Sequence, residues 1–318
     1  MKIGNNIQQA ADYLKSGELV AIPTETVYGL AANGLNPKSI LKIFEAKNRP
    51  FFDPLILHTN SLEKIHLLVS EIPSQALALT QKFWPGPLTL LLPKSPIVPD
   101  LVCSGLPRVA VRIPDHPLTL ELLSQLDFPL AAPSANPFGY VSPTTAEHVE
   151  KQLGNKVAYI LNGGPCKIGV ESTIIGFEEE KPVIYRAGGV TMESIKDILP
   201  EIKLFRSNEN KPAAPGQLKS HYAPLKKLYL GNPDVLLRQF PAEKTGIISF
   251  FNNFNCRKNI VLSREKDLQE AAAKLFSAIR SLDENEEIEN IVAEIFPDEF
   301  LGRAINDRLS RAAHRKTT

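Results

Sequence analysis

Two cations separated by one residue, Lys47 and Arg49, stand at the end of a predicted amphipathic helix. Asn36 as a cap, Pro37 in the first turn and apolar residues at helical spacing indicate this helix. A turn rich in hydroxyl groups, residues 24–28, precedes it. Because Lys and Arg neutralise phosphates and carboxylates, paired cations beside hydroxyl groups predict a pocket for a small anionic ligand.

Polar side chains also stand at or near the ends of several predicted strands. These residues are Thr24, His58, Arg112, Ser134 and Arg186. Because ligands gather at the carboxyl ends of strands in α/β sheets, we expect the side chains to line one concavity. Arg112 lies within an apolar strand, and a buried arginine needs an anionic partner. Glu25 or Asp115 could be that partner in place of a ligand.

Hydroxyl and amide groups near these positions complete the candidate chemistry. They belong to Thr24, Ser134, Asn136, Ser142, Ser172 and Thr173. The sequence contains no Walker-type loop, no Gly-x-Gly-x-x-Gly after a strand, no His-Glu-x-x-His and no Gly-x-Ser-x-Gly. Nothing indicates a covalent nucleophile. A nucleotide or acyl-phosphate site that works by positioning and charge neutralisation fits these residues best.

The composition is that of a globular protein without a disulfide framework. The chain has 318 residues, 43% of them hydrophobic, and a net charge of +1, which does not predict a general nucleic-acid binder. The three cysteines are far apart, so neither a zinc site nor a disulfide is expected. No signal peptide or membrane-spanning run is recognisable, and we expect a cytoplasmic protein without membrane contact.

The pattern of elements predicts an α/β protein of two domains joined by a linker. Short apolar runs ending at prolines alternate with helices through residues 1–204. Residues 205–225 are polar and rich in proline, as in an extended linker. Strands alternate with helices again through residues 226–318, which predicts a small parallel α/β domain.

Six sequence blocks, in order along the chain, resemble those of a known family. They are Pro23-Thr-Glu-Thr-Val-Tyr-Gly29; Lys47-Asn-Arg-Pro50 with Pro54-Leu-Ile-Leu-His58; Trp84-Pro-Gly-Pro-Leu-Thr-Leu90; Val109-Ala-Val-Arg-Ile-Pro114; Pro133-Ser-Ala-Asn136 with Ser142-Pro-Thr144; and Gly169-Val-Glu-Ser-Thr173. With the linker block 215–224 and the tail block 302–309, the chain resembles the YrdC-like threonylcarbamoyl-AMP synthases in their longer two-domain form.

The resemblance implies a fold and a reaction. The expected fold is a twisted mixed sheet with helices around a concave cleft, followed by a smaller Rossmann-like parallel α/β domain. The implied enzyme is a nucleotidyltransferase, an L-threonylcarbamoyladenylate synthase. It would use L-threonine, bicarbonate and ATP, release pyrophosphate and pass its product to a downstream tRNA threonylcarbamoyl transferase complex. Mg²⁺ is expected with ATP, with no dedicated protein ligands and no organic cofactor.

The resemblance also implies roles for individual residues. Lys47 and Arg49 would neutralise the phosphates and serve as the catalytic cations. The threonine-binding residues would be Thr24, His58, Arg112, Ala132 and Ser172. The other nucleotide contacts would be Ser134, Asn136, Ser142, Arg186, His221 and Tyr222, the last two in the linker that closes over the pocket.

Two positions depart from the pattern of the family. Residues 137–139 read Pro-Phe-Gly where x-Ser-Gly is more usual, which removes one hydroxyl group near the nucleotide. Residues 185–188 read Tyr-Arg-Ala-Gly in place of Leu-Arg-Pro-Gly, which retains Arg186 in a different turn.

Other interpretations of these residues stay open at this point. Lys47 and Arg49 could only satisfy a helix dipole and face solvent, and Thr24 could be only a turn hydroxyl. A second kind of function is a tRNA- or double-stranded-RNA-binding module without catalysis, although weak RNA contact is compatible with catalysis. A third is carbamoyl transfer from carbamoyl phosphate, whose enzymes carry zinc modules that three cysteines cannot supply.

Overall fold

The chain forms two compact units in the computed structural model, which describes residues 2–205, 214–215 and 221–314. The first unit comprises residues 1–138, 143–167 and 171–217, and the second comprises 139–142, 168–170 and 218–318. Two short segments that precede residue 204 thus belong to the second unit. Most of the predicted linker, residues 206–213 and 216–220, lies outside the described residues.

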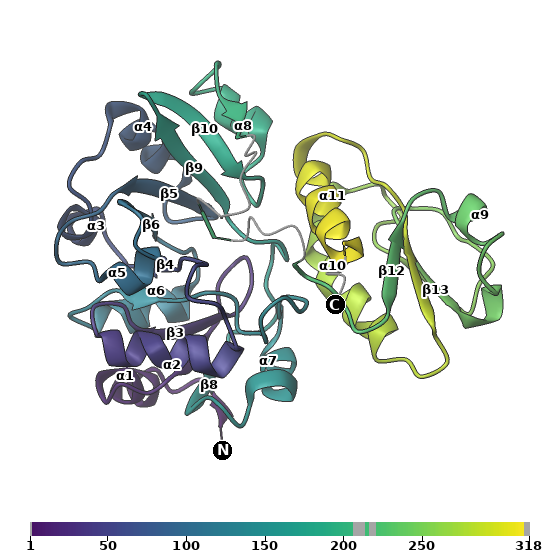
Figure 1. The fold of residues 1–318 in the computed structure, drawn as a ribbon, viewed down its shortest axis with the longest axis horizontal. Helices are drawn as coiled ribbons and strands as arrows, with labels where there is room; N and C mark the ends of the chain where they lie inside the picture. Colours follow the sequence, from purple (N-terminus) through teal and green to yellow (C-terminus); the bar gives the residue numbers. More distant parts are fainter. Residues whose placement is uncertain (1, 206–213, 216–220, 315–318) are drawn as a thin grey trace. The chain divides into compact units, whose positions relative to one another are not determined.

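The first unit is built on a mixed sheet (Figure 1). In spatial order its described strands are β1 (Ile3–Gly4), β8 (Tyr159–Leu161), β2 (Val20–Ile22), β3 (Gly29–Asn33), β7 (Leu130–Ala131), β4 (Ile56–His58), β6 (Arg108–Arg112), β5 (Leu88–Pro93), β9 (Thr173–Glu178), β10 (Lys181–Arg186) and β11 (Lys203–Leu204). Each of these described strands is only two to six residues long, so the loops between them supply much of the unit.

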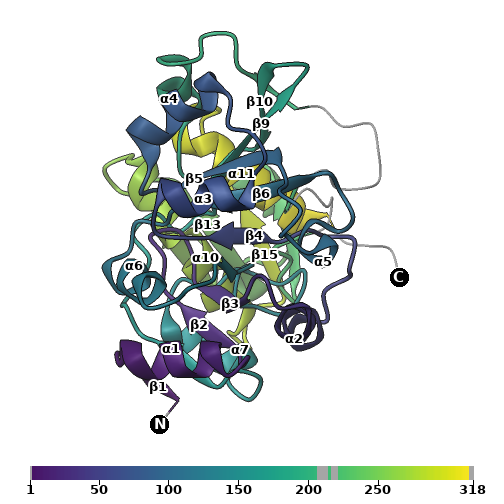
Figure 2. The same ribbon diagram turned by 90° about the vertical axis from the view of Figure 1, so that its left-hand side faces the viewer.

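Helices cover the two faces of this sheet unequally. They are α1 (Ile7–Lys15), α2 (Pro37–Lys47), α3 (Leu62–Leu68), α4 (Ser74–Phe83), α5 (Asp100–Cys103), α6 (Pro117–Ser124), α7 (Ala146–Leu153) and α8 (Met192–Lys196). The buried residues of α1 and α6 pack with Val20 and Ile22, whereas α2, α3, α4, α5, α7 and α8 share a core with Ala21. Since neighbouring residues of a strand point to opposite faces, α1 and α6 pack on one face and the other helices pack on the opposite one. Figure 2 shows α6 and α2 on opposite sides of β3.

Strand directions correct one expectation from the sequence. β2 and β7 are each antiparallel to β3, and β4 and β6 run parallel to each other and opposite to β7. The carboxyl ends of β2 and β7 therefore do not meet those of β4 and β6 at one edge, as they would in a parallel sheet. The sequence also gave no sign of β3, because its residues follow a polar turn and contain two alanines and a glycine.

The helix that carries Lys47 forms for reasons that the sequence shows. Asn36 accepts hydrogen bonds from the backbone N–H groups of Lys38 and Ser39, and Pro37 occupies the first helical position of α2. The buried stripe includes Ile40, Ile43 and Phe44, and the helix stops where Asn48 turns left-handed at φ 52°. The last residue of α2, Lys47, is buried.

The second unit is a small parallel sheet with helices, as predicted. Its strands lie in the order β12 (Lys227–Leu230), β15 (Asn290–Ala293), β13 (Thr245–Ser249) and β14 (Lys258–Val261). Its described helices are α9 (Pro233–Leu236), the short 3₁₀ turn Ala242–Lys244, α10 (Leu268–Asp283) and α11 (Phe300–Ala313). Within this unit, α10 and α11 pack together on one side of the sheet, and α9 lies on the other (Figure 1).

Among the helices of the described residues, no stretch combines the length and apolar character that crossing a membrane requires.

The cap of α2 gives a first testable prediction. Asn36→Ala removes the side-chain acceptor for two backbone N–H groups, so the free energy of unfolding should fall by about 1 kcal/mol. Urea denaturation of the full chain measures this change. Asn36→Asp keeps an acceptor at the same place and should stay close to wild type; an equal loss in both variants would contradict the role of the cap.

Candidate active site

The alternation of side chains along the strands brings three predicted threonine-binding residues to one face of the large sheet. His58 and Arg112 are register partners at the ends of β4 and β6, and Ser172 immediately precedes β9. Each is two residues away from a member of one apolar cluster on this face, whose members are Ile56, Leu91, Ala110, Ile174, Tyr185 and Ala214. Ala214, from the predicted linker, is fully buried there.

Arg112 is held by the loop that follows β2. Its Nη2 donates to Glu25 Oε1 at 2.6 Å, its Nη1 to Thr26 Oγ1 at 3.1 Å and its Nε to the carbonyl of Gly86 at 3.1 Å. Glu25, rather than Asp115, is thus the anionic partner, and both members of the pair are buried. The pair connects strands that run in opposite directions, and it fixes the guanidinium in the plane of these bonds.

Thr24 organises the turn that carries Glu25. Its Oγ1 accepts from the backbone N–H groups of Thr26 and Val27, both at 3.2 Å, and lies 2.6 Å from the carbonyl of Val27. The structure therefore bears out the interpretation of Thr24 as a turn hydroxyl. A threonine-binding role for Thr24 stays a prediction.

His58 is a neutral imidazole at physiological pH. Burial, followed by the positive charge of Arg112, lowers its pKa to about 3, against the opposing effect of the carbonyls of Ile56 and Leu130. Its Nδ1 lies 3.2 Å from the carbonyl oxygen of Ile56. Because a carbonyl only accepts, Nδ1 carries the proton and Nε2 has a free lone pair.

Lys47 does not face solvent. Its side chain is buried, and Nζ donates to the carbonyls of Ser134 and Asn136, each at 2.5 Å. Burial, with a smaller effect of Arg49, lowers the pKa of Lys47 well below its usual value, although Asp53 opposes the shift. Lys47 therefore shapes the loop after β7 and places a cation against it.

Arg49 fixes the loop between α2 and β4. Its Nε donates to the carbonyl of Asp53 at 3.0 Å, and its Nη2 donates to the carbonyl of Pro54 at 2.8 Å. The same Nη2 forms a buried ion pair with Asp53 Oδ2 at 3.0 Å. The interpretation of Lys47 and Arg49 as solvated helix-end charges is wrong, because both are buried.

The loop after β7 runs beside the turn before β3. Ser134 forms a bridge with Gly29, the amide of Ala135 donates to Tyr28, and the amide of Ala132 donates to Ile56. A Cβ at Gly29 would lie 3.2 Å from that of Ala132, so the close approach favours glycine. The hydroxyl of Ser134 is half-buried and has no hydrogen-bond partner among the described residues, which leaves it available to a ligand.

Ser172 and Arg186 form one hydrogen-bonded unit. Arg186 donates to the Ser172 carbonyl from Nε at 3.1 Å and from Nη2 at 3.0 Å, and Nη2 also reaches the Ser172 hydroxyl at 3.1 Å. Its Nη1 lies 3.3 Å from the carbonyl of Pro215, in the predicted linker. Arg186, next to the departure at Ala187, is buried against Ser172.

Three predicted nucleotide contacts belong to the second unit, namely Ser142, His221 and Tyr222. Within that unit Tyr222 is buried, takes the left-handed φ of 64° and stacks on Phe276 with ring centroids 5.4 Å apart. Its ring also packs edge-on against His221 and below Arg308. These contacts fix the backbone at the end of the linker.

Sequence reasoning assigned no role to three residues that hold the site together. Thr26 bonds Arg112, Asp53 pairs with Arg49, and the hydroxyl of Thr89 lies 2.7 Å from that of Ser172. The spacing of Arg49 and Asp53, four residues apart, was a usable signal for the second contact. Thr89 lies within a matching sequence block, but nothing in one sequence pairs it with Ser172.

The described residues contain no group of three or more His, Cys, Asp or Glu side chains that could hold a metal ion. The buried carboxylates of Glu25 and Asp53 are paired with Arg112 and Arg49. That Mg²⁺ comes with ATP and has no dedicated protein ligands stays a prediction.

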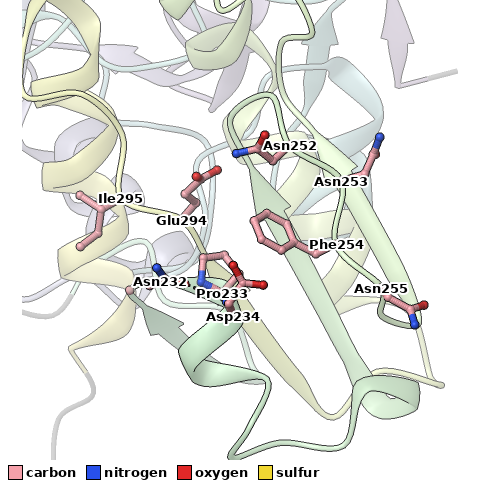
Figure 3. A pocket seen from close by; sticks show the side chains of 10 residues that line it. Asn232, Pro233, Asp234, Asn252, Asn253, Phe254, Asn255, Glu294 and Ile295 are labelled. Carbon is pink, nitrogen blue, oxygen red and sulfur yellow. Dashed lines mark hydrogen bonds between the residues drawn. The ribbon is translucent and has the colours of Figure 1, made fainter.

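A separate hollow of about 610 Å³ lies in the second unit, where the loops after β12, β13 and β15 meet (Figure 3). Its lining includes Asn232, Asp234, Asn252 and Glu294. Asn232 caps α9 and Glu294 accepts from the amide of Phe250 at 2.7 Å, so these polar groups serve the local fold. None of the predicted site residues lines this hollow.

Comparison with known families gives two matches that together span almost the whole chain. A family described as "telomere recombination" matches residues 12–188. A second, described as the C-terminal domain of threonylcarbamoyl-AMP synthase, matches residues 190–314.

Curated proteins and solved structures agree with these matches. Threonylcarbamoyl-AMP synthase of Bacillus subtilis is 42% identical over 96% of this chain and 92% of its own length. That of Pyrococcus abyssi is 39% identical over 96% of this chain and 94% of its own length. The crystal structure of P. abyssi Sua5 complexed with L-threonine superposes with a TM-score of 0.90 over 96% of this chain and 94% of that one.

A more distant structure supports the fold alone. E. coli YciO is 21% identical and has a TM-score of 0.52 over 58% of this chain and 93% of its own. The near full-length relatives, by contrast, match 96% of this chain, which includes both units. The chain belongs to the threonylcarbamoyl-AMP synthase family, in its two-domain form.

Proposed function

We propose that this chain makes threonylcarbamoyl-AMP and pyrophosphate from L-threonine, bicarbonate and ATP, as a nucleotidyltransferase. Family membership over nearly the full length supports the reaction class. Threonine binding is assigned to particular residues on one observation. Arg112, neutral His58 and Ser172 lie on one face of the large sheet. That face combines one fixed cation, one hydrogen-bond acceptor and one hydroxyl, which suit an amino acid with a polar side chain.

Threonine would bind at this face. Arg112 has N–H groups beyond those given to Glu25, Thr26 and Gly86, and they would pair with the α-carboxylate. The free Nε2 of His58 would accept from the hydroxyl or amino group of threonine. Ser172, fixed by Arg186 and Thr89, would offer a third polar contact. The P. abyssi relative crystallised with L-threonine supports this ligand.

The phosphates of ATP would bind beside Lys47 and Arg49. Both cations donate to loop carbonyls, and these bonds would hold them in position for the phosphates with little reorganisation. Ser134 and Asn136, on the loop held by Lys47, would contact the nucleotide. Mg²⁺ would arrive with ATP and screen its phosphates, held by the nucleotide and water.

The reaction divides into two steps. The amine of threonine and bicarbonate condense to a carbamate with loss of water. A carbamate oxygen then attacks the α-phosphorus of ATP, the bond to the bridging β-phosphate oxygen breaks, and pyrophosphate leaves. The residues would align the reactants and offset the negative charge of the leaving group. His58 would act as a hydrogen-bond acceptor. With a pKa of about 3, its protonated form is hardly populated near neutral pH and cannot serve as a general acid.

The predicted linker would exclude water from the labile product. Ala214 is buried on the face that carries Arg112, and Pro215 accepts from Arg186. A P. abyssi Sua5 variant in which an adjacent His and Tyr are replaced by alanine has been solved, and His221-Tyr222 is the single His-Tyr pair in this sequence. We propose a cytoplasmic enzyme that passes its product to a tRNA threonylcarbamoyl transferase complex, with at most weak contact to RNA.

The requirement for three substrates tests the proposed function directly. Pyrophosphate release by the full chain should need ATP, threonine and bicarbonate together, because the carbamate must form before the α-phosphorus is attacked. A coupled pyrophosphate assay, with each substrate omitted in turn, measures this. Release that continues without threonine would rule out the proposed reaction, and RNA binding without any release would favour the RNA-binding alternative.

Lys47→Met should lower the rate of pyrophosphate release by about 100-fold or more, because a positioned cation is lost at the phosphates. Lys156→Met is the matched control, since Lys156 Nζ also donates to a backbone carbonyl, that of Ala46, at 2.8 Å. The control should stay within about threefold of wild type, and circular dichroism should show both variants folded. Equal rates in the two variants would show that Lys47 has no phosphate role.

His58 should make the stability of the chain depend on pH. Its folded pKa of about 3 lies below the unfolded value of about 6.5, so the unfolded state takes up a proton first as the pH falls. Between pH 7.5 and 4.5 wild type should therefore lose roughly 3 kcal/mol more unfolding free energy than His58→Gln, which cannot be protonated. Urea denaturation at both pH values measures the difference; parallel losses would mean that His58 is charged in the folded protein.

A further inference from the structure

Residues 139–142 pass from one compact unit into the other. Phe138 and Pro143 belong to the first unit, whereas the four residues between them belong to the second. This short segment, which we call the crossing loop, includes Ser142 and follows Asn136 by three residues. Both of these residues are predicted nucleotide contacts.

The crossing loop is held by the end of α10. The hydroxyl of Tyr140 donates to Asp283 Oδ2 at 2.6 Å, and Arg280 Nη2 donates to the carbonyl of Val141. The guanidinium of Arg280 also lies over the ring of Tyr140, 5.2 Å from its centroid. Burial, and then Asp283, raise the pKa of Tyr140, so its hydroxyl keeps the proton that it donates.

The same aspartate also accepts hydrogen bonds from the chain at the end of the linker. The amide of Leu225 donates to Asp283 Oδ2 at 3.1 Å, and the amide of Lys226 donates to Oδ1 at 2.8 Å. The amide of Ala223 also donates to the carbonyl of Gly139 at 2.8 Å. Asp283 is buried, so its three bonds, from Tyr140, Leu225 and Lys226, are formed largely out of water.

The chain just before the crossing loop is held separately, in the first unit. The amide of Phe138 donates to the carbonyl of Lys47 at 2.8 Å, and Lys47 Nζ bonds the carbonyls of Ser134 and Asn136. Residues 134–138 are thus held by Lys47 within the first unit, and residues 139–142 are held by α10 within the second.

We propose that Asp283 is a positioning residue for nucleotide binding, acting through Tyr140 and the amides of residues 225–226. The inference rests on the proposed function and deepens it. Asp283 joins the crossing loop and the end of the linker into one body, so that Ser142 and the His221-Tyr222 pair are ordered together. Because these bonds hold the predicted nucleotide contacts without any part of the nucleotide, their loss should weaken ATP binding and leave threonine binding unchanged.

Tyr140→Phe tests the proposal with the removal of one hydroxyl group. The KM for ATP should rise about tenfold, the scale of one hydrogen bond to a charged group, and the KM for threonine should stay within about twofold. Tyr229→Phe is the matched control, because the hydroxyl of Tyr229 makes no hydrogen bond to the described residues and its ring packs on Phe240 in the same unit. Lowered stability with an unchanged KM for ATP would overturn the proposal.

Substitutions of Asp283 give a graded second test. Asp283→Asn keeps one oxygen acceptor and Asp283→Ala keeps none, so the rise in KM for ATP should be smaller for Asn than for Ala. Equal effects of the two substitutions, or a KM for threonine that rises in parallel, would indicate a general structural defect and contradict the proposal.

Hydrogen exchange of the ligand-free protein separates this proposal from the proposed function. In Asp283→Ala the amides of residues 139–142 and 223–226 should both exchange faster, while β12 and β15 keep their protection. If exchange became faster in only one of these two segments, the proposed coupling of the crossing loop to the end of the linker would be wrong, whatever the rate of pyrophosphate release. A wild-type chain that releases no pyrophosphate would instead refute the proposed function and leave this result to stand.

Discussion

The ion pair of Arg112 with Glu25 is the constraint on which the candidate site depends. Both charges are buried, and removing either partner from such a pair leaves an uncompensated charge out of water. The pair also joins the turn after β2 to the end of β6, two elements whose strands run in opposite directions. A mixed sheet has no single carboxyl edge to collect ligand-binding residues. Here the ion pair of Arg112 with Glu25 brings the turn after β2 and the end of β6 together.

The two-residue period of the strands explains why distant residues share one face. Ile56 and Ala110 are buried in one apolar cluster, so His58 and Arg112, two positions later, must lie on the same face. The helices α1 and α6 cover this face only at its end near β2, and Ala214 of the predicted linker is buried farther along it. The site thus lies on the face of the sheet that helices leave least covered.

The sequence was enough to predict the family, the two α/β domains and the reaction class, because six blocks in fixed order are highly specific. It also limited the anionic partner of Arg112 to Glu25 or Asp115, and Glu25 is the partner in the structure. The mixed sheet followed from the resemblance, but β3 and the burial of Lys47 could not be predicted, since each depends on contacts between distant segments. A cation at a helix end looks the same in one sequence whether it faces water or two carbonyls.

The division of the chain into units explains a glycine that the sequence alone did not. Gly169 has a φ of +76°, and a Cβ there would lie 2.5 Å from the carbonyl oxygen of Ala272 in α10. Its segment, 168–170, therefore packs on α10, while Ser172, two residues later, bonds Arg186 in the first unit. The crossing loop likewise belongs to the second unit and lies between residues of the first unit in the sequence. The segments 139–142 and 168–170 are thus both held by α10 within the second unit.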